Sequence, residues 1–246
     1  MNYRSMCRSV SVLLLVVIAM KSHAQGIDVV TDDSSYAYLR DGKLVGPGTR
    51  VVEQTLKEAV FADYRFLLYP WARAYEKALR EANVLIYPMV RTPAREPLFK
   101  WVGEMTHITT QFYRLREGPQ FAVRTLEDAK QYSIGVVRDD SRQVYLQEQG
   151  FIRLVVSANN RDNFQKLINH QVQLLPMHET DARRISHEAQ VDFERLEAVG
   201  TLDGLPASVY MAFSLSTPDD IVSRARAAFE QLKASGEIDR LMEPDH

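Results

Sequence analysis

The sequence contains only one cysteine, Cys7, which lies among the first 24 residues. A single cysteine excludes an intrachain disulfide, and the rest of the chain has no thiolate nucleophile and no cysteine metal ligand. We therefore expect the fold to be stabilised by its apolar core, which is feasible for a chain of 246 residues.

The chain also lacks an excess of positive charge. It has 30 Lys and Arg against 32 Asp and Glu, a formal charge of −2, and without residues 1–24 the charge becomes −5. A nucleic-acid partner would require a basic face, so we expect none. A small anionic ligand is still compatible with this balance, because a few local arginines suffice to bind it.

Long hydrophobic runs are absent except for one near the start, Ser11–Met20. It is too short to span a bilayer, which takes ~20 apolar residues. Arg4 and Arg8 precede it and Ser22-His23-Ala24 follows it, an order typical of a cleavable signal peptide. We predict a signal peptide over residues 1–24 and a soluble, periplasmic mature chain.

Common catalytic signatures are missing as well. The sequence has no Gly-x-Ser-x-Gly elbow, no phosphate-binding glycine loop and no His-Glu-x-x-His, and His170, His178 and His187 are not spaced as metal ligands. The sequence therefore predicts no enzyme activity, no cofactor and no metal site.

Strand-like and helix-like segments alternate along the chain. A helix is expected over Thr49–Phe61 with Val52, Leu56, Ala59 and Val60 on one face, and a second helix opens at Pro70 with an apolar stripe. The stripe contains Trp71, Tyr75, Ala78, Leu79 and Ala82. The expected strands around these helices are Ile27–Thr31, Tyr64–Tyr69 and Val84–Ile86.

The same alternation returns after residue 115. Thr125–Asp128 is typical of a capped helix start, and Thr217 with Pro218 predicts the start of a late helix that ends at Gly236. Two α/β units of similar rhythm predict two lobes. The segments between these helices are a strand over Ser133–Val137, a helix over Ser141–Gln149 and a strand over Leu154–Ser157.

A threonine-proline-x-arginine element, Thr92-Pro93-Ala94-Arg95, follows one predicted strand and stands in a characteristic order with other short segments. These are Val30-Thr31-Asp32 before Tyr36, Asp41–Gly46, Tyr69–Ala74, Leu126-Glu127-Asp128, Ile134-Gly135-Val136 and Ala234–Ile238. Their order over nearly the whole mature chain resembles the amino-acid-type periplasmic solute-binding proteins, the bacterial extracellular solute-binding protein family 3.

This resemblance implies an α/β, two-lobe clamp of the type II periplasmic-binding-protein kind, with a mixed sheet and flanking helices in each lobe and two hinge crossings. The first lobe would comprise residues 26–112 and 211–246, and the second lobe residues 113–210. A solute would bind in the cleft between the lobes of a monomer.

The resemblance also implies roles for individual residues. Arg95 would bind a ligand carboxylate through its planar fork of donors, Thr92 would add a hydrogen bond, and Tyr36 would pack over the ligand. Ser141 and Arg142 would meet the ligand from the second lobe at a helix N-terminus. Trp71 and Arg91 complete the set of candidate contacts, together with His178.

His178 stands where amino-acid binders of this family carry an acidic residue for the ligand ammonium. This departure favours a small polar, anionic, carboxylate-bearing solute over an α-amino acid. The expected function is solute capture for an ABC-type transporter with a membrane permease as partner. The alternatives are a ligand-sensing clamp for a membrane receptor, and a periplasmic dehydratase or lyase using a cleft histidine.

Each candidate also has an ordinary structural explanation. Arg95 can pair with Glu96 or Glu104 at the surface, Arg91 can face solvent, and Trp71 belongs to the buried stripe of its helix. Ser141 can serve only as a helix cap, and His178 only as a hydrogen-bonded residue at a helix start.

Overall fold

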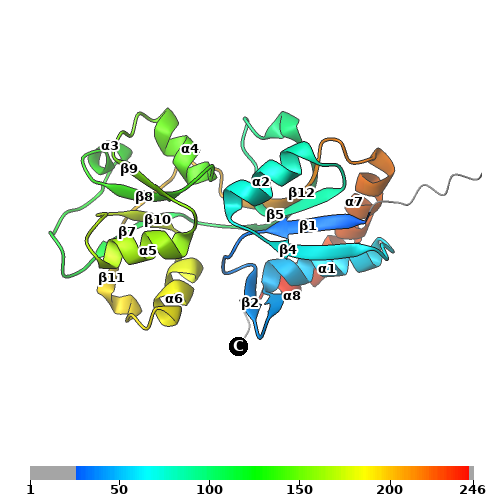
Figure 1. Ribbon diagram of the computed structural model, residues 1–246, viewed down its shortest axis with the longest axis horizontal. Helices are drawn as coiled ribbons and strands as arrows, with labels where there is room; N and C mark the ends of the chain where they lie inside the picture. Colours follow the sequence, from blue (N-terminus) through cyan, green and yellow to red (C-terminus); the bar gives the residue numbers. More distant parts are fainter. Residues whose placement is uncertain (1–25, 244–246) are drawn as a thin grey trace, which may run out of the picture.

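The computed structural model describes residues 26–243, which form two lobes lying side by side along the long axis of the molecule (Figure 1). Each lobe contains β-structure flanked by helices, which confirms the predicted two-lobe α/β fold class. The predicted signal peptide, residues 1–24, lies outside the described residues. Within residues 26–243, no helix combines the length and apolar character needed to span a membrane.

The first lobe is built on a five-stranded sheet with the strand order β4-β1-β5-β12-β6. β1 runs parallel to β4 and β5, whereas β12 runs antiparallel to β5 and β6. The parallel strands therefore end at the same edge of the sheet. The bounds are β1 Ile27–Thr31, β4 Tyr64–Leu68, β5 Val84–Val90, β6 Phe99–His107 and β12 Ser208–Ser214.

Helices cover both faces of this sheet. Side chains alternate between the faces along each strand, so apolar residues of the same strand pack against helices on opposite sides. Val29 and Leu85 belong to the cluster that contains α1, α7 and α8 residues, whereas Val30 and Ile86 belong to the cluster under α2. The bounds are α1 Pro47–Glu58, α2 Trp71–Arg80, α7 Asp219–Ala234 and α8 Glu237–Met242, with a hairpin of β2 Tyr38–Arg40 and β3 Lys43–Val45 and a 3-10 turn over Glu96–Leu98.

Two predicted helix faces were wrong at their C-terminal ends. α1 ends at Glu58, and Val60 adopts a positive φ of 56° and is 80% exposed, because the chain leaves the helix there. α2 ends at Arg80, so Ala82 lies beyond it, and Leu79 is exposed. Pro70 and Pro218 precede their helices as N-cap residues instead of occupying the first helical position.

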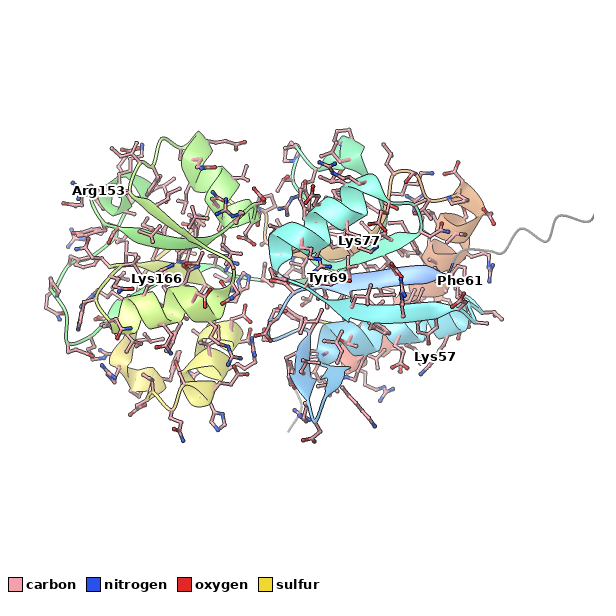
Figure 2. All side chains as sticks on the ribbon, in the orientation of Figure 1. Lys57, Phe61, Tyr69, Lys77, Arg153 and Lys166 are labelled. Carbon is pink, nitrogen blue, oxygen red and sulfur yellow. The ribbon has the colours of Figure 1, made fainter. Side chains whose placement is uncertain are left out.

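Charged side chains connect α2 to β1 and β4 of the sheet. Lys77 of α2, labelled in Figure 2, lies with Nζ 2.9 Å from Oδ2 of Asp28 on β1. Arg65 of β4 donates from Nε to the other oxygen of Asp28 at 2.6 Å. The two cations lower the pKa of Asp28, the hydrogen bond from Arg65 being the largest cause and burial acting in the opposite direction.

The second lobe contains two small sheets. β10, β7 and β11 form an antiparallel sheet in that order, and β8 pairs in parallel with β9. An isolated bridge between Ile134 and Leu174 places β8 next to the chain that enters β10. The bounds are β7 Gln111–Leu115, β8 Ile134–Val137, β9 Leu154–Ser157, β10 Leu175–Met177 and β11 Leu196–Thr201.

Capping side chains define where the helices of this lobe begin. Thr125 and Asp128 form the predicted capping box at α3, and Asn159 caps α5. At α4 the cap is Asp140, so Ser141 is the first helical residue and not the cap. The bounds are α3 Leu126–Ala129, α4 Ser141–Glu148, α5 Asn160–Ile168 and α6 Glu179–Glu188, with a 3-10 turn over Phe193–Arg195.

Two chain segments connect the lobes, one between β6 and β7 and one between β11 and β12. They are hydrogen-bonded to each other, since Ile108 N donates to Ala207 O at 2.6 Å and Leu202 N donates to Thr110 O at 2.9 Å. β7 already begins at Gln111 and β12 at Ser208. The domain limits expected from the sequence, residues 112/113 and 210/211, remain predictions.

Candidate functional site

A cavity lies between the two lobes, where the carboxyl ends of β1 and β5 face those of β8, β9 and β10. This is the edge at which open α/β sheets bind ligands. Its free volume is about 50 Å³. We call it the cleft cavity. Its polar lining comprises Asp32, Ser34, Tyr36 and Arg95 from the first lobe, Thr110 from a crossing, and Asp140, Ser141, Arg142, Asn160, His178 and Asp181 from the second.

Arg95 faces this cavity and is only 5% exposed. A turn after β5 positions it, because its backbone N–H donates to Thr92 O at 3.0 Å and to Thr92 Oγ1 at 3.2 Å. Its guanidinium lies over the rings of Trp71 and Tyr75, at 5.2 and 4.9 Å from their centroids. The structure therefore places the predicted anchor inside, and not in a surface pair with Glu96 or Glu104.

The Arg95 side chain also connects the lobes. Nη1 donates to Val90 O at 3.1 Å within the first lobe, and Nη2 donates to Asp139 O at 3.2 Å in the second. Trp71 Nε1 donates to the same Asp139 oxygen at 2.9 Å. Asp139 has a positive φ of 59°, held by a bond from its N–H to Gln143 Oε1 at 2.6 Å. This backbone geometry presents the Asp139 carbonyl to both donors.

Arg142 and Asp140 form a buried ion pair at the start of α4. Asp140 Oδ1 accepts from Arg142 N at 2.9 Å and from Arg142 Nε at 2.5 Å, and Arg142 Nη1 donates to Pro176 O at 3.1 Å. Burial acts to raise the pKa of Asp140, but the charge and hydrogen bonds of Arg142 lower it below its usual value. Asp140 is therefore ionised at neutral pH and neutralises much of the Arg142 charge.

Asp32 and Asp181 also line the cavity, and the sequence did not predict either of them as a site residue. Burial, followed by the charges of Asp140 and Asp181, raises the pKa of Asp32 to about 8. Asp181 accepts a hydrogen bond from the backbone N–H of Ser35 across the lobes at 2.6 Å. The cavity thus offers acceptors for a cationic group as well as the Arg95 guanidinium.

His178 is the N-cap residue of α6 and contacts a crossing segment. Its Nδ1 lies 3.2 Å from Thr109 O and 3.5 Å from Thr110 Oγ1. Burial lowers its pKa, so the ring is neutral at pH 7. Asp181, one turn later in α6, also lines the cavity, so the cavity contains a carboxyl group although His178 stands at the position where an acid was expected.

The other predicted contacts divide into two groups. Tyr36, Trp71 and Ser141 line the cleft cavity, and burial raises the pKa of Tyr36 to about 12. Thr92 does not line it but borders an adjoining cavity. Arg91 lies at the surface in a bidentate pair with Glu96, at 2.6 Å for both bonds, so the structure does not bring it to the cleft.

The arrangement is suited to holding a ligand through polar contacts from both lobes. Within residues 26–243, no group of three or more His, Cys, Asp or Glu residues is placed to bind a metal ion. Arg95 and Arg142 provide donors, Asp32 and Asp181 provide acceptors, and Tyr36 and Trp71 provide aromatic surface.

Comparison with known proteins identifies structural relatives only. No protein-family model matches the sequence, and no curated protein is significantly similar to it. A histidine kinase sensor domain with similarity to periplasmic binding proteins superposes with a TM-score of 0.76 at 17% identity, covering 88% of this chain and 94% of the other.

Two binding proteins superpose equally well. One is the arginine-, lysine-, histidine-binding protein ArtJ from Geobacillus stearothermophilus, with a TM-score of 0.75, 15% identity and coverage of 88% and 93%. The other is the amino acid ABC transporter substrate-binding protein AbpA from Streptococcus pneumoniae, bound to L-arginine, with a TM-score of 0.75, 15% identity and coverage of 88% and 92%. At this identity the likeness establishes the fold that these proteins share with the chain.

Proposed function

We propose that this protein is a periplasmic solute-binding protein that captures a small polar solute in the cleft cavity and delivers it to an ABC-type importer. The observation that carries the proposal is the buried Arg95 guanidinium, which faces a cavity lined by both lobes. A guanidinium in such a place binds a carboxylate through two parallel hydrogen bonds. The structural likeness to amino-acid-binding proteins supports this assignment.

The charges around the cavity refine the expected solute. A purely anionic solute would meet the acidic side chain of Asp181 as well as Arg95, which is unfavourable. Asp32, whose pKa is raised to about 8, is largely protonated at neutral pH and does not add to this repulsion. An amino-acid-like solute avoids this conflict, because its carboxylate pairs with Arg95 and its ammonium with Asp181. We therefore propose a zwitterionic or cationic solute that carries one carboxylate.

Titration calorimetry with a panel of amino acids and simple carboxylates tests the proposal. We expect a dissociation constant in the micromolar range or below for at least one zwitterion, and much weaker binding of its deaminated analogue. A preference for the deaminated acid would support the purely anionic solute instead. Recovery of the solute unchanged after incubation would argue against a dehydratase or lyase.

Sensing is the second candidate function, favoured by the likeness to a histidine kinase sensor domain. A solute-loaded clamp can contact a receptor instead of a permease. Stimulation of the ATPase of a reconstituted permease by the loaded protein would support transport. Solute-dependent binding to a receptor ectodomain, with no such stimulation, would support sensing.

A further inference from the structure

A second cavity adjoins the cleft cavity between the lobes. Its volume is about 530 Å³, far larger than the cleft cavity. Arg95, Ser141 and Leu205 line both cavities, so the two are neighbours across these side chains. We call the second cavity the side groove. Its apolar lining includes Tyr75, Pro93, Ala94, Val144, Tyr145 and Pro206.

The side groove lies between the turn after β5 and Tyr75 of α2 in the first lobe and α4 in the second lobe, with the crossing residues Gly204, Leu205 and Pro206 also in its lining. In Figure 1, α2 and α4 lie on either side of the lobe boundary. Val144 lies on α4 and is 37% exposed, although it is a large apolar residue. The residues of α4 that are buried in the fold are Ser141, Arg142, Gln143 and Leu146. The fold itself therefore does not cover Val144.

The sizes of the two cavities suit different parts of one molecule. The cleft cavity carries the charged groups but has little free space, whereas the side groove falls within the roughly 300–1,000 Å³ typical of small-molecule sites. A solute whose carboxylate is held by Arg95 lies close to the wall of Arg95, Ser141 and Leu205 that both cavities share. An apolar extension of the solute that passes this wall would enter the side groove.

We infer that the solute is an amino acid with an extended apolar or aromatic side chain, and that this tail occupies the side groove while the charged head lies in the cleft cavity. The inference rests on the proposed function, because Arg95 must hold the head. Burial of the tail between Val144, Tyr145 and Tyr75 then adds affinity through removal of apolar surface from water.

Two matched pairs of probes test the inference by titration calorimetry: L-glutamine with L-γ-glutamyl-p-nitroanilide, and L-alanine with L-homophenylalanine. The members of each pair share the α-carboxylate and α-ammonium and differ in the tail. For wild type we expect the tailed member of at least one pair to bind at least tenfold more tightly. Equal affinities within both pairs would overturn the inference and leave the proposed function intact.

Val144→Asp places a charge in the side groove and is expected to abolish that tenfold gain, while the affinity of the tailless member changes less than threefold. Ile152→Asp is the control, since Ile152 is 90% exposed and lines neither cavity. Thermal unfolding of both variants checks that they fold. Equal weakening of both members by Val144→Asp would overturn the inference. Failure of wild type to bind any of the four probes would count against the proposed zwitterionic solute and the tail together.

Discussion

Replacement of Arg95 by alanine tests the central assignment, and Arg91 provides a matched control four residues away. Arg95 faces the cleft cavity, whereas Arg91 lies at the surface beside Glu96 and over the rings of Trp101 and Tyr210. Both substitutions remove one guanidinium from the same segment of chain. Only Arg95→Ala removes a donor from the proposed site.

The expected loss of binding free energy in Arg95→Ala follows from the hydrogen bonds that Arg95 can make. In the structure it donates to two backbone carbonyls, Val90 O and Asp139 O, at 3.1 and 3.2 Å. A solute carboxylate would add charge-assisted hydrogen bonds, which contribute about 1.5–3 kcal/mol. Loss of this energy corresponds to a rise of roughly 10- to 150-fold in the dissociation constant. Arg95→Lys keeps the charge but not the planar fork, so we expect an intermediate value.

Titration calorimetry with one carboxylate-bearing solute would measure the dissociation constants of wild type, Arg95→Ala, Arg95→Lys and Arg91→Ala. We expect Arg91→Ala to bind within a factor of two of wild type. The melting temperature of each ligand-free variant reports on folding. Equal affinity of wild type and Arg95→Ala, with both folded, would refute the assignment of Arg95 as the carboxylate anchor.

Three further predictions concern single residues. The raised pKa of Asp32 means that the folded state keeps a proton that the unfolded chain loses, so the free energy of unfolding should fall between about pH 4 and pH 8, by up to about 1.4 kcal/mol per pH unit. Urea unfolding should show a smaller fall for Asp32→Asn than for wild type. Identical pH profiles of the two proteins would contradict this pKa. Asp139 has a φ of 59°, so Asp139→Gly should leave the free energy of unfolding unchanged or raise it by up to about 1 kcal/mol, while Asp139→Val should lower it by about 1–3 kcal/mol. Equal urea-unfolding midpoints of the two variants would show that the left-handed backbone has no such cost. Gly103→Ala should lower the free energy of unfolding by about 1–3 kcal/mol, because a Cβ atom would lie 2.1 Å from the Phe229 ring. A urea-unfolding midpoint equal to that of wild type would mean that the ring moves away at no cost.

The fold could be predicted from the sequence because its signals are local. The alternation of strands and helices, the capping pair Thr125 and Asp128, and the end of α7 just before Gly236 each depend on residues close together in the chain. The end of α1 was predicted too late, because Val60 continues the apolar pattern although the backbone has already left the helix. Apolar periodicity alone does not reveal that change.

The candidate site was only partly predictable. Arg95 stands in a recognisable segment, and its inward orientation agrees with the sequence-based expectation, while its contact with a solute stays a prediction. Asp181 had a weaker signal, its position in the first turn of α6 after β10. Its place in the cleft depends on Ser35, 146 residues away in the sequence, so it follows from the approach of the two lobes. No local pattern encodes that approach.

The shared acceptor at Asp139 has a consequence for the kinetics of solute binding. Trp71 and Arg95 both donate to this one carbonyl oxygen of the opposite lobe, so they stabilise the observed arrangement of the lobes before a solute binds. If a solute enters only when the lobes separate, these bonds must break first, and the observed association rate should level off at the rate of lobe separation as the solute concentration rises. The apparent affinity is then reduced because only the fraction of molecules with separated lobes can bind solute. Weakening the two hydrogen bonds to the Asp139 carbonyl would therefore speed solute binding.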